Sequence, residues 1–429
     1  MRITTSSLLL LLGLNSLMAQ NSIRKDTLKL SRAQSENLFL EKNLSLISER
    51  LNIDQAATKI IQSKLWPNPT LSVDQVNLWS TSSQQGTLPP LYRGFGTKSQ
   101  ISVELEQLVT TAGKRKKMID LDKVSLEISQ QYFEDFLRNL KLEFRNNLTQ
   151  LQHTQAEQSI YAKQLNAFQN LLKNYQKQVD NGVISRSEFI RLKASELAFL
   201  KEINDLQKTN NELQKELKIL MGLSPALTLY ITPEGFTPDM QKIEATNIDS
   251  LIQLALENRP DLKMTHLEET YASKMHQYEK AQRVPDLTFK AGYDRGGNIM
   301  NDFVGLGLSF DIPFFDRNQG NIKSAKIGIE KSKIATEQKN NETQSEVIQV
   351  YNDLWTTKSL LRNIASTYED ELDSLLDNHL KNFTQRNLSM IEYLDFVDAY
   401  LENKKIILDA TKELNEHFEQ LKWVIGKEI

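Results

Sequence analysis

The chain has 429 residues, with 52 basic and 55 acidic side chains, no cysteine, 16 glycines and 10 prolines. So few helix-breaking residues in so long a chain favour long helices. The lack of cysteine excludes a disulfide scaffold, thiolate metal sites, a cysteine nucleophile and a lipid-modified N-terminal cysteine. A formal net charge of -3 argues against a general nucleic-acid binder, which needs a concentrated basic surface.

The first residues are typical of a secretory signal peptide. Arg2 precedes the apolar run Leu8–Leu12, and Ala19 is a small residue of the kind that precedes a cleavage site. We therefore predict that residues 1–19 are removed and that the protein is exported. No later segment offers the ~20 apolar residues that a membrane-spanning helix needs, so any membrane crossing must use β-strands.

The chain contains an internal repeat. Shifted by 204 positions, Val179–Gly222 aligns with Phe383–Gly426 without a gap, and 12 of 44 positions are identical. Shifted by 216 positions, Leu38–Val73 aligns with Leu254–Phe289, with 9 of 36 positions identical. We interpret this as a tandem duplication of one unit.

Both units have the same predicted order of elements: a helix, a β-hairpin and a long helical hairpin. The first unit, residues 20–246, has its helix at Ser35–Leu65, its β-hairpin at about 70–108 and its helical hairpin at about 114–222. The second unit, residues 247–429, has these at Asn247–Arg283, about 287–311 and about 319–426. Prolines after both first helices mark their ends.

Polar and apolar residues alternate along both predicted β-hairpins, as in strands with one apolar and one wet face. In the second hairpin the apolar positions, which we expect to face lipid, are Leu287, Phe289, Val304, Leu306 and Leu308. Four strands leave two open edges, which a membrane does not tolerate. Three chains would supply twelve strands, enough for a closed barrel with a polar interior.

The helical hairpins are predicted to be unusually long. Lys114–Asp180 contains no proline or glycine, and its apolar residues recur three or four positions apart. At 1.5 Å per residue this helix is roughly 100 Å long. A break at Asn181-Gly182 leads to a returning helix, and the second unit repeats the pattern with helices over Gln319–Thr384 and Ser389–Ile425. Such helices must pack as antiparallel, coiled-coil-like hairpins with partners from other chains.

This arrangement resembles the outer-membrane efflux protein family, the TolC-like exit ducts. The segments that carry the likeness are Trp66–Leu71, Glu106–Leu108, Gly113–Arg115, Asn181–Ser185, Leu220–Leu223, Phe310–Gly320, Phe383–Ile391 and Val424–Gly426. Within the family the chain is most similar to the divalent-metal and small-cation efflux branch, because it stops just after Gly426. The resemblance implies a mainly α fold in which a homotrimer forms a twelve-stranded barrel in outer-membrane lipid, continued by a periplasmic α-helical barrel.

The resemblance also implies a function: a passive exit duct for metal cations or small toxic compounds in a tripartite efflux system. Its partners would be a periplasmic adaptor (membrane fusion) protein and an inner-membrane efflux pump. We expect adaptor docking at the hairpin tips, formed by Gly182, Val183, Ile184, Ser185, Arg386, Asn387, Leu388 and Ser389. The family match places a periplasmic gate at Glu392 and Asp395, where the family carries two aspartates.

No pattern indicates a catalytic, cofactor or metal site, so we predict that the protein is not an enzyme. The five histidines lack the same-face spacing of metal ligands. The basic run Lys114–Lys117 either meets lipid headgroups or begins a solvated helix. The alternative function is an exported periplasmic coiled-coil scaffold without a pore. Two alternating strand pairs at equivalent repeat positions argue against it, because a scaffold has no use for them.

Overall fold

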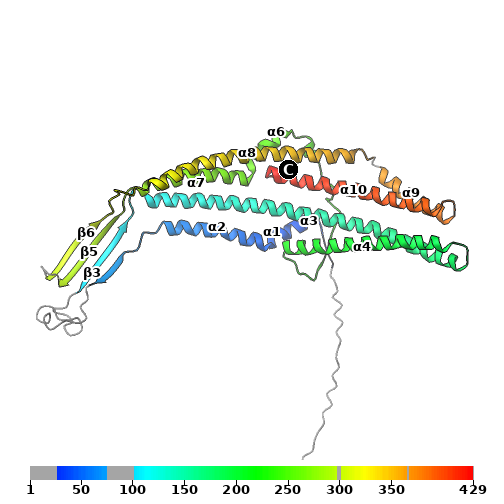
Figure 1. The fold of residues 1–429 in the computed structure, drawn as a ribbon, viewed down its shortest axis with the longest axis horizontal. Coiled ribbons are helices and arrows are strands. Elements are labelled where there is room, and N and C mark those ends of the chain that lie inside the picture. The colour runs from blue at the N-terminus through cyan, green and yellow to red at the C-terminus, as the bar shows by residue number, and fades with distance from the viewer. Residues whose placement is uncertain (1–26, 75–100, 297–300, 365–366, 429) are drawn as a thin grey trace, which may run out of the picture.

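The computed structural model describes residues 27–74, 101–296, 301–364 and 367–428, so the predicted signal peptide lies outside the described residues. The chain forms a long, gently curved molecule with a β-sheet at one end and the tips of two helical hairpins at the other (Figure 1). Most of the described residues are helical. Within these ranges we find no helix with an apolar stretch of bilayer-spanning length.

Four long helices build the body of the molecule: α3 (Lys114–Asp180), α4 (Arg186–Leu220), α8 (Gln319–Arg362) and α10 (Met390–Ile425). Helix α3 has 67 residues, as predicted, and is therefore about 100 Å long. It packs against α4 and α10 as well as against the shorter helices that precede each hairpin. One continuous helix thus contacts both halves of the chain.

In the described part of the second half, no helix is as long as α3. Helix α8 ends at Arg362 and a separate helix, α9 (Tyr368–Thr384), follows, so the prediction of one helix over Gln319–Thr384 is wrong. The first turn of α9 carries Glu369, Asp370 and Glu371, and negative charge at that position favours the start of a new helix. Lys404 of α10 holds this turn through an ion pair with Glu369 at 3.1 Å.

The helix predicted over Ser35–Leu65 is also divided, into α1 (Arg32–Lys42) and α2 (Leu44–Ser63). Asn43 lies at the bend. Its side-chain oxygen accepts a hydrogen bond from the Leu46 N–H at 2.9 Å, and its side-chain amide donates to the Leu220 carbonyl at 2.8 Å. An asparagine that satisfies helix ends in this way competes with a continuous helix.

The helix predicted over Asn247–Arg283 is likewise two helices, α6 (Ile248–Asn258) and α7 (Pro260–Gln282). Pro260 begins α7, the position that proline favours in a helix. The residue before a proline avoids the helical conformation, and Arg259 accordingly has φ -59° and ψ 123°. The chain therefore bends at Arg259, whose side chain becomes buried.

One antiparallel sheet contains β2 (Thr70–Asp74), β3 (Ser102–Val109), β5 (Leu287–Gly296) and β6 (Asn301–Ser309), in the order β2-β3-β5-β6. The two predicted strand pairs thus join through β3 and β5. The register places Phe289 opposite Leu308 and Ala291 opposite Leu306. Directly opposed residues share a face, so the five positions predicted to face lipid lie on one face of the sheet.

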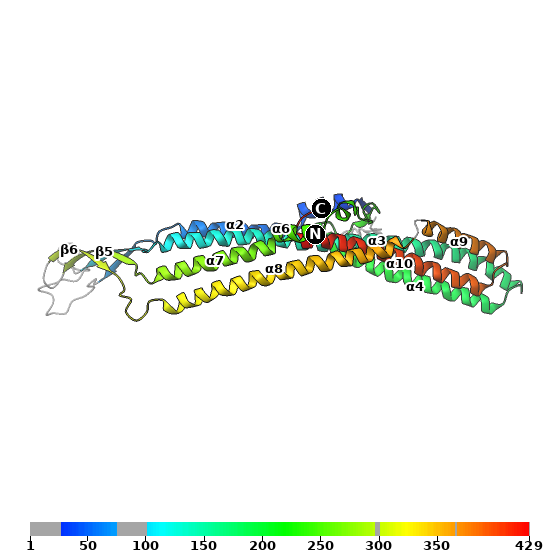
Figure 2. The same cartoon turned by 90° about the horizontal axis from the view of Figure 1, so that it is seen from above.

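A second, smaller sheet was not predicted. Strands β1 (Thr27–Leu30) and β4 (Thr228–Ile231) pair in parallel, and four residues are too few for a periodicity signal. Their apolar side chains join a core in which the rings of Phe39 and Phe144 stack with centroids 4.5 Å apart. Together with α1, α5 (Gln241–Glu244) and α6, this pair lies beside the long helices near the middle of the molecule (Figure 2).

Candidate docking and gating site

The two hairpin tips have the same backbone turn. Gly182 at the first tip and Arg386 at the second both have positive φ, 71° and 64°. In each turn the backbone N–H of the next residue donates a hydrogen bond to the carbonyl five positions earlier. Val183 donates to Gln178 at 2.8 Å, and Asn387 donates to Asn382 at 2.9 Å. Such bonds satisfy carbonyls at the end of a helix. A left-handed conformation costs a non-glycine residue roughly 1–2 kcal/mol, so the second tip is held by its surroundings.

The tips contact each other through Arg386, whose guanidinium donates a hydrogen bond to the Gln178 side chain at 3.1 Å. Both returning helices begin with a serine cap. Ser185 accepts a hydrogen bond from the Glu188 N–H at 3.2 Å, and Ser389 accepts one from the Glu392 N–H at 3.3 Å. The eight residues predicted at the tips therefore form two neighbouring, well-capped turns.

The apolar residues of the tips differ in exposure. Ile184 and Leu388 are half-buried and pack against a hydrophobic cluster inside the chain, so they support the turns. Val183 is 54% exposed. Ile391, just beyond the second tip, is exposed as well. An open groove of about 280 Å³ separates the beginnings of the returning helices and is lined by Ser187, Glu188, Arg191, Ser389, Met390 and Ile391.

An aromatic stack joins the two hairpins behind the tips. Phe383 of α9 lies between Tyr175 of α3 and Tyr393 of α10, with ring centroids 5.6 Å and 4.7 Å away. Phe168 of α3 stacks on Tyr393 at 5.9 Å. Burial raises the pKa of Tyr393 to about 12, so its hydroxyl stays neutral. The four helices at this end form one packed unit.

The two predicted gate residues lie on α10 directly behind the second tip, and both are exposed. The Glu392 carboxylate accepts a hydrogen bond from the Ser389 N–H at 2.8 Å, which closes a capping box and lowers the pKa of Glu392. Asp395 follows three residues later, on the same side of the helix. Burial first, and then the nearby Asp395, raise the pKa of Asp398. The negative charge thus continues along α10.

The polar face of the large sheet carries an ion-pair cluster. Lys290 of β5 contacts two carboxylates of β3, Glu104 at 2.8 Å and Glu106. The opposite face exposes large apolar side chains, with Leu306 88% and Val304 73% exposed. The sheet therefore has one charged face and one apolar face.

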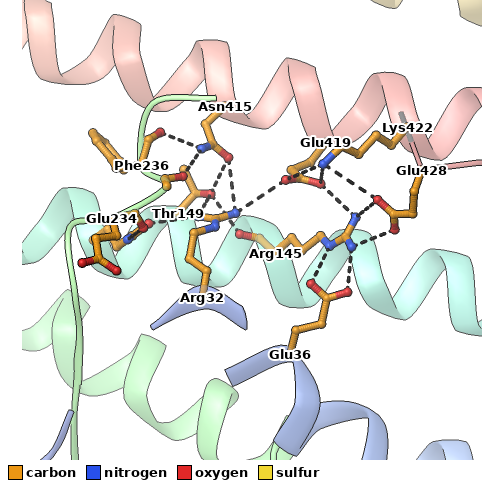
Figure 3. A network of polar contacts seen from close by, with 12 residues as sticks. Arg32, Glu36, Arg145, Thr149, Glu234, Phe236, Asn415, Glu419, Lys422 and Glu428 are labelled. Atoms are coloured by element: carbon orange, nitrogen blue, oxygen red, sulfur yellow. Dashed lines mark hydrogen bonds and ion pairs between the residues drawn. The ribbon is translucent and has the colours of Figure 1, made fainter. Parts of the chain in front are cut away.

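A polar network at mid-length, which no sequence pattern predicted, ties both ends of the described chain to α3 (Figure 3). Arg145 of α3 contacts Glu36 of α1 at 2.7 Å, Glu419 of α10 at 3.0 Å and Glu428 at 2.7 Å. Burial lowers the pKa of Arg145, but its hydrogen bonds to Glu36 and Glu428 outweigh burial and raise it. A helical arginine in the printed sequence gives no sign of such a role.

A second buried cluster forms at the bend before α7. Arg259 is 1% exposed and makes a bidentate contact with Asp261, at 3.0 Å and 2.6 Å. Arg138 and Lys339 also contact the Asp261 carboxylate, at 3.3 Å and 3.0 Å. Burial raises the pKa of Asp261, but these cations more than offset it and hold the pKa far below its usual range. Because Arg138 is on α3 and Lys339 on α8, the cluster locks three helices together.

Long helical hairpins that end in capped tips and carry an amphipathic sheet at the far end define a recognisable class of protein. Solved structures share this fold. A structure of CusC covers 92% of this chain and 92% of its own, with a TM-score of 0.69 and 17% identity. The Campylobacter jejuni CmeC outer membrane channel covers 92% and 85%, with a TM-score of 0.71 and 13% identity. The fold is that of outer-membrane channels.

The chain belongs to the outer membrane efflux protein family. The family's sequence profile matches it twice, over residues 37–223 and 251–426. A curated relative is the cobalt-zinc-cadmium resistance protein CzcC of Cupriavidus metallidurans, which is 21% identical over 286 residues. The aligned part covers 66% of this chain and 63% of the length of that relative.

Proposed function

We propose that the protein is the outer-membrane channel of a tripartite efflux system and acts as a homotrimer. The observation that carries this proposal is the sheet, whose edge strands are β2 and β6 and whose two faces differ in polarity. Three copies would pair β6 of one chain with β2 of the next and close a twelve-stranded barrel. The apolar face would contact lipid, and Lys290 with its two carboxylates would face the aqueous interior.

The two units of the chain, residues 20–246 and 247–429, would each contribute one strand pair and one helical hairpin to this assembly. The helices would continue the barrel through the periplasm as an α-helical barrel. A scaffold without a pore remains the alternative, but the exposed apolar face that includes Leu306 and Val304 is unsuited to water. Lipid is a better environment for it.

The tips would dock a periplasmic adaptor protein, which connects the channel to an inner-membrane pump. Gly182 to Ser185 and Arg386 to Ser389 lie at the end of the molecule farthest from the sheet (Figure 1). Val183 supplies exposed apolar surface there, and the groove between the returning helices offers an open recess. These features support a small tip-to-tip interface.

Glu392 and Asp395 would form the periplasmic gate. Three-fold symmetry would gather both carboxylates from each chain around the axis, a site that attracts cations. Both carboxylates are exposed, and Glu392 in addition caps its own helix through the Ser389 N–H. For the cargo we propose metal cations or small toxic compounds, because the relative CzcC is a cobalt-zinc-cadmium resistance protein.

The experiment that tests the channel uses purified outer membranes. A trimer that survives cross-linking, migrates differently before and after heating on a gel and conducts ions in planar bilayers supports the proposal. Leu306→Arg should impair barrel assembly, because a cation near the lipid midplane costs about 2–4 kcal/mol. The matched control is Thr288→Arg on the opposite face, which should assemble normally. A soluble periplasmic monomer, or equal effects of the two substitutions, would refute the proposal.

A further inference from the structure

The segment between β6 and α8 forms an open groove at the junction of sheet and helices, which we call the junction groove. Its volume is about 660 Å³, and its lining residues are Arg283, Phe314, Phe315, Arg317, Gln319, Ile322, Lys323 and Lys326. Four of these eight side chains are cationic and none is acidic. The groove therefore combines strong positive charge with aromatic surface.

The aromatic part is exposed to an unusual degree. Phe314 and Phe315 are 69% and 89% exposed, and their rings pack edge to face with centroids 4.8 Å apart. Phe310 and Ile312, which precede them, are also exposed, at 52% and 78%. Four large, exposed apolar side chains within six residues are typical of a binding surface.

Among the described residues, no carboxylate pairs with the cations of the groove. Arg283, Arg317, Lys323 and Lys326 form no ion pair with any residue that the structure describes. The neighbouring carboxylates contact Asn318 and form no ion pair with these four cations: Asp316 accepts a hydrogen bond from the Asn318 N–H at 2.8 Å, and Glu279 accepts one from the Asn318 side chain at 2.6 Å. The charge of the groove is thus available to an anion.

The position of the groove identifies the kind of anion. It begins five residues after the end of β6 and extends over the first two turns of α8. Near the same boundary, the guanidinium of Arg115 lies 4.2 Å from the centroid of the Trp66 ring, a cation–aromatic pair. If the sheet crosses the outer membrane, as the proposed function holds, this boundary lies among lipid headgroups on the periplasmic side.

We propose that the junction groove binds an anionic phospholipid of the periplasmic leaflet. The four cations would contact the headgroup phosphate, while Phe314 and Phe315 would pack against the upper part of an acyl chain. A neutral-headgroup lipid would receive only the apolar contact. The groove is therefore expected to select lipids by headgroup charge.

The test uses the purified full chain, stripped of lipid in detergent and titrated with phosphatidylglycerol or with phosphatidylcholine of equal chain length. Bound lipid is counted by native mass spectrometry. The triple variant Arg317→Ala, Lys323→Ala, Lys326→Ala should bind phosphatidylglycerol about a hundredfold more weakly, since each basic residue near an anionic lipid contributes about fivefold. Its binding of phosphatidylcholine should not change.

The matched control removes the same charges farther along the same helix, with Lys331→Ala, Lys333→Ala and Arg362→Ala, three exposed cations. It should retain the preference for phosphatidylglycerol. Phe314→Ala with Phe315→Ala should weaken both lipids by a similar factor, because the apolar contact does not depend on the headgroup. A control variant that loses selectivity as the groove variant does would overturn the proposal.

Two other outcomes would also overturn it. Inorganic phosphate that displaces phosphatidylglycerol at equal concentration would make the groove a site for free anions. The second outcome is a wild-type protein that binds both lipids equally, together with a groove variant that dissociates into monomers. That result would make the groove a contact between copies of this chain. The conductance and trimer assays distinguish these results from failure of the proposed function: a conducting trimer without lipid selectivity refutes the groove alone.

Discussion

The aromatic stack behind the tips determines how firmly the two hairpins are joined. Phe383 is 3% exposed and is in contact with Tyr175 of α3 and Tyr393 of α10. It lies on α9, a helix of 17 residues that is separated from α8 by a break. Replacing Phe383 with alanine should therefore loosen α9 while leaving the rest of the chain folded.

The size of the effect follows from the contacts that are lost. Truncating a buried phenylalanine to alanine costs roughly 3–5 kcal/mol, and aromatic pairs contribute about 0.5–1.5 kcal/mol each within that total. Every 1.4 kcal/mol changes an equilibrium constant tenfold. Helix α9 of Phe383→Ala should then open between about a hundred and a few thousand times more often than in the wild type.

Hydrogen–deuterium exchange read by mass spectrometry measures this opening directly. Amides of α9 should exchange faster by that factor, while amides in the first half of α3 should keep their rates. Phe315→Ala is a suitable control, because Phe315 is 89% exposed and lies between β6 and α8, next to the sheet and not at the tips. A folded Phe383→Ala protein with unchanged exchange in α9 would show that the stack does not hold the tips together.

Two further predictions concern charged residues. Changing both Glu392 and Asp395 to alanine should reduce cation selectivity and weaken block by divalent cations in planar bilayers; a conducting variant with unchanged selectivity would remove them from the gate. Burial raises the pKa of Glu157 above its ordinary value of 4.5, so ionisation destabilises the native state as the pH rises. Glu157→Gln should therefore raise the unfolding temperature near pH 8 and have no effect on it near pH 4. The control Glu402→Gln changes an exposed glutamate and should leave the unfolding temperature unchanged at both pH values. An equal shift of the unfolding temperature in both variants would contradict the prediction.

The long helix α3, the strand pairs and the tips could be predicted, because each depends on a local pattern in the sequence. The α3 helix has no proline or glycine over its 67 residues, and polar and apolar residues alternate along most of each strand pair, so the sequence predicts both the long helix and the strands. The positions of the tips followed from the breaks at Gly182 and Asn387. The exposure of individual tip residues did not follow, because it depends on packing between hairpins far apart in the chain.

The features that the sequence did not reveal depend on distant partners. Asn43 ends a helix by bonding to Leu220, and Arg145 is held by Glu428, 283 residues away. Arg259 reads as an ordinary helical arginine until the following Pro260 is recognised as a helix start. The preference of proline for the first turn of a helix predicts the bend, but no local pattern predicts the burial of Arg259 against Asp261.

The mid-length network has a consequence for how the molecule acquires its structure. β1 pairs with β4 some 200 positions later, Arg32 contacts Asn415 across 383 positions, and Glu428 is the last described residue. Contacts between such distant positions require large loops to close and slow folding. The contacts of Arg145 with Glu419 and Glu428 can therefore form only after α10 and the residues behind it have been synthesised, although Glu36 is available earlier, so the two halves complete this network together.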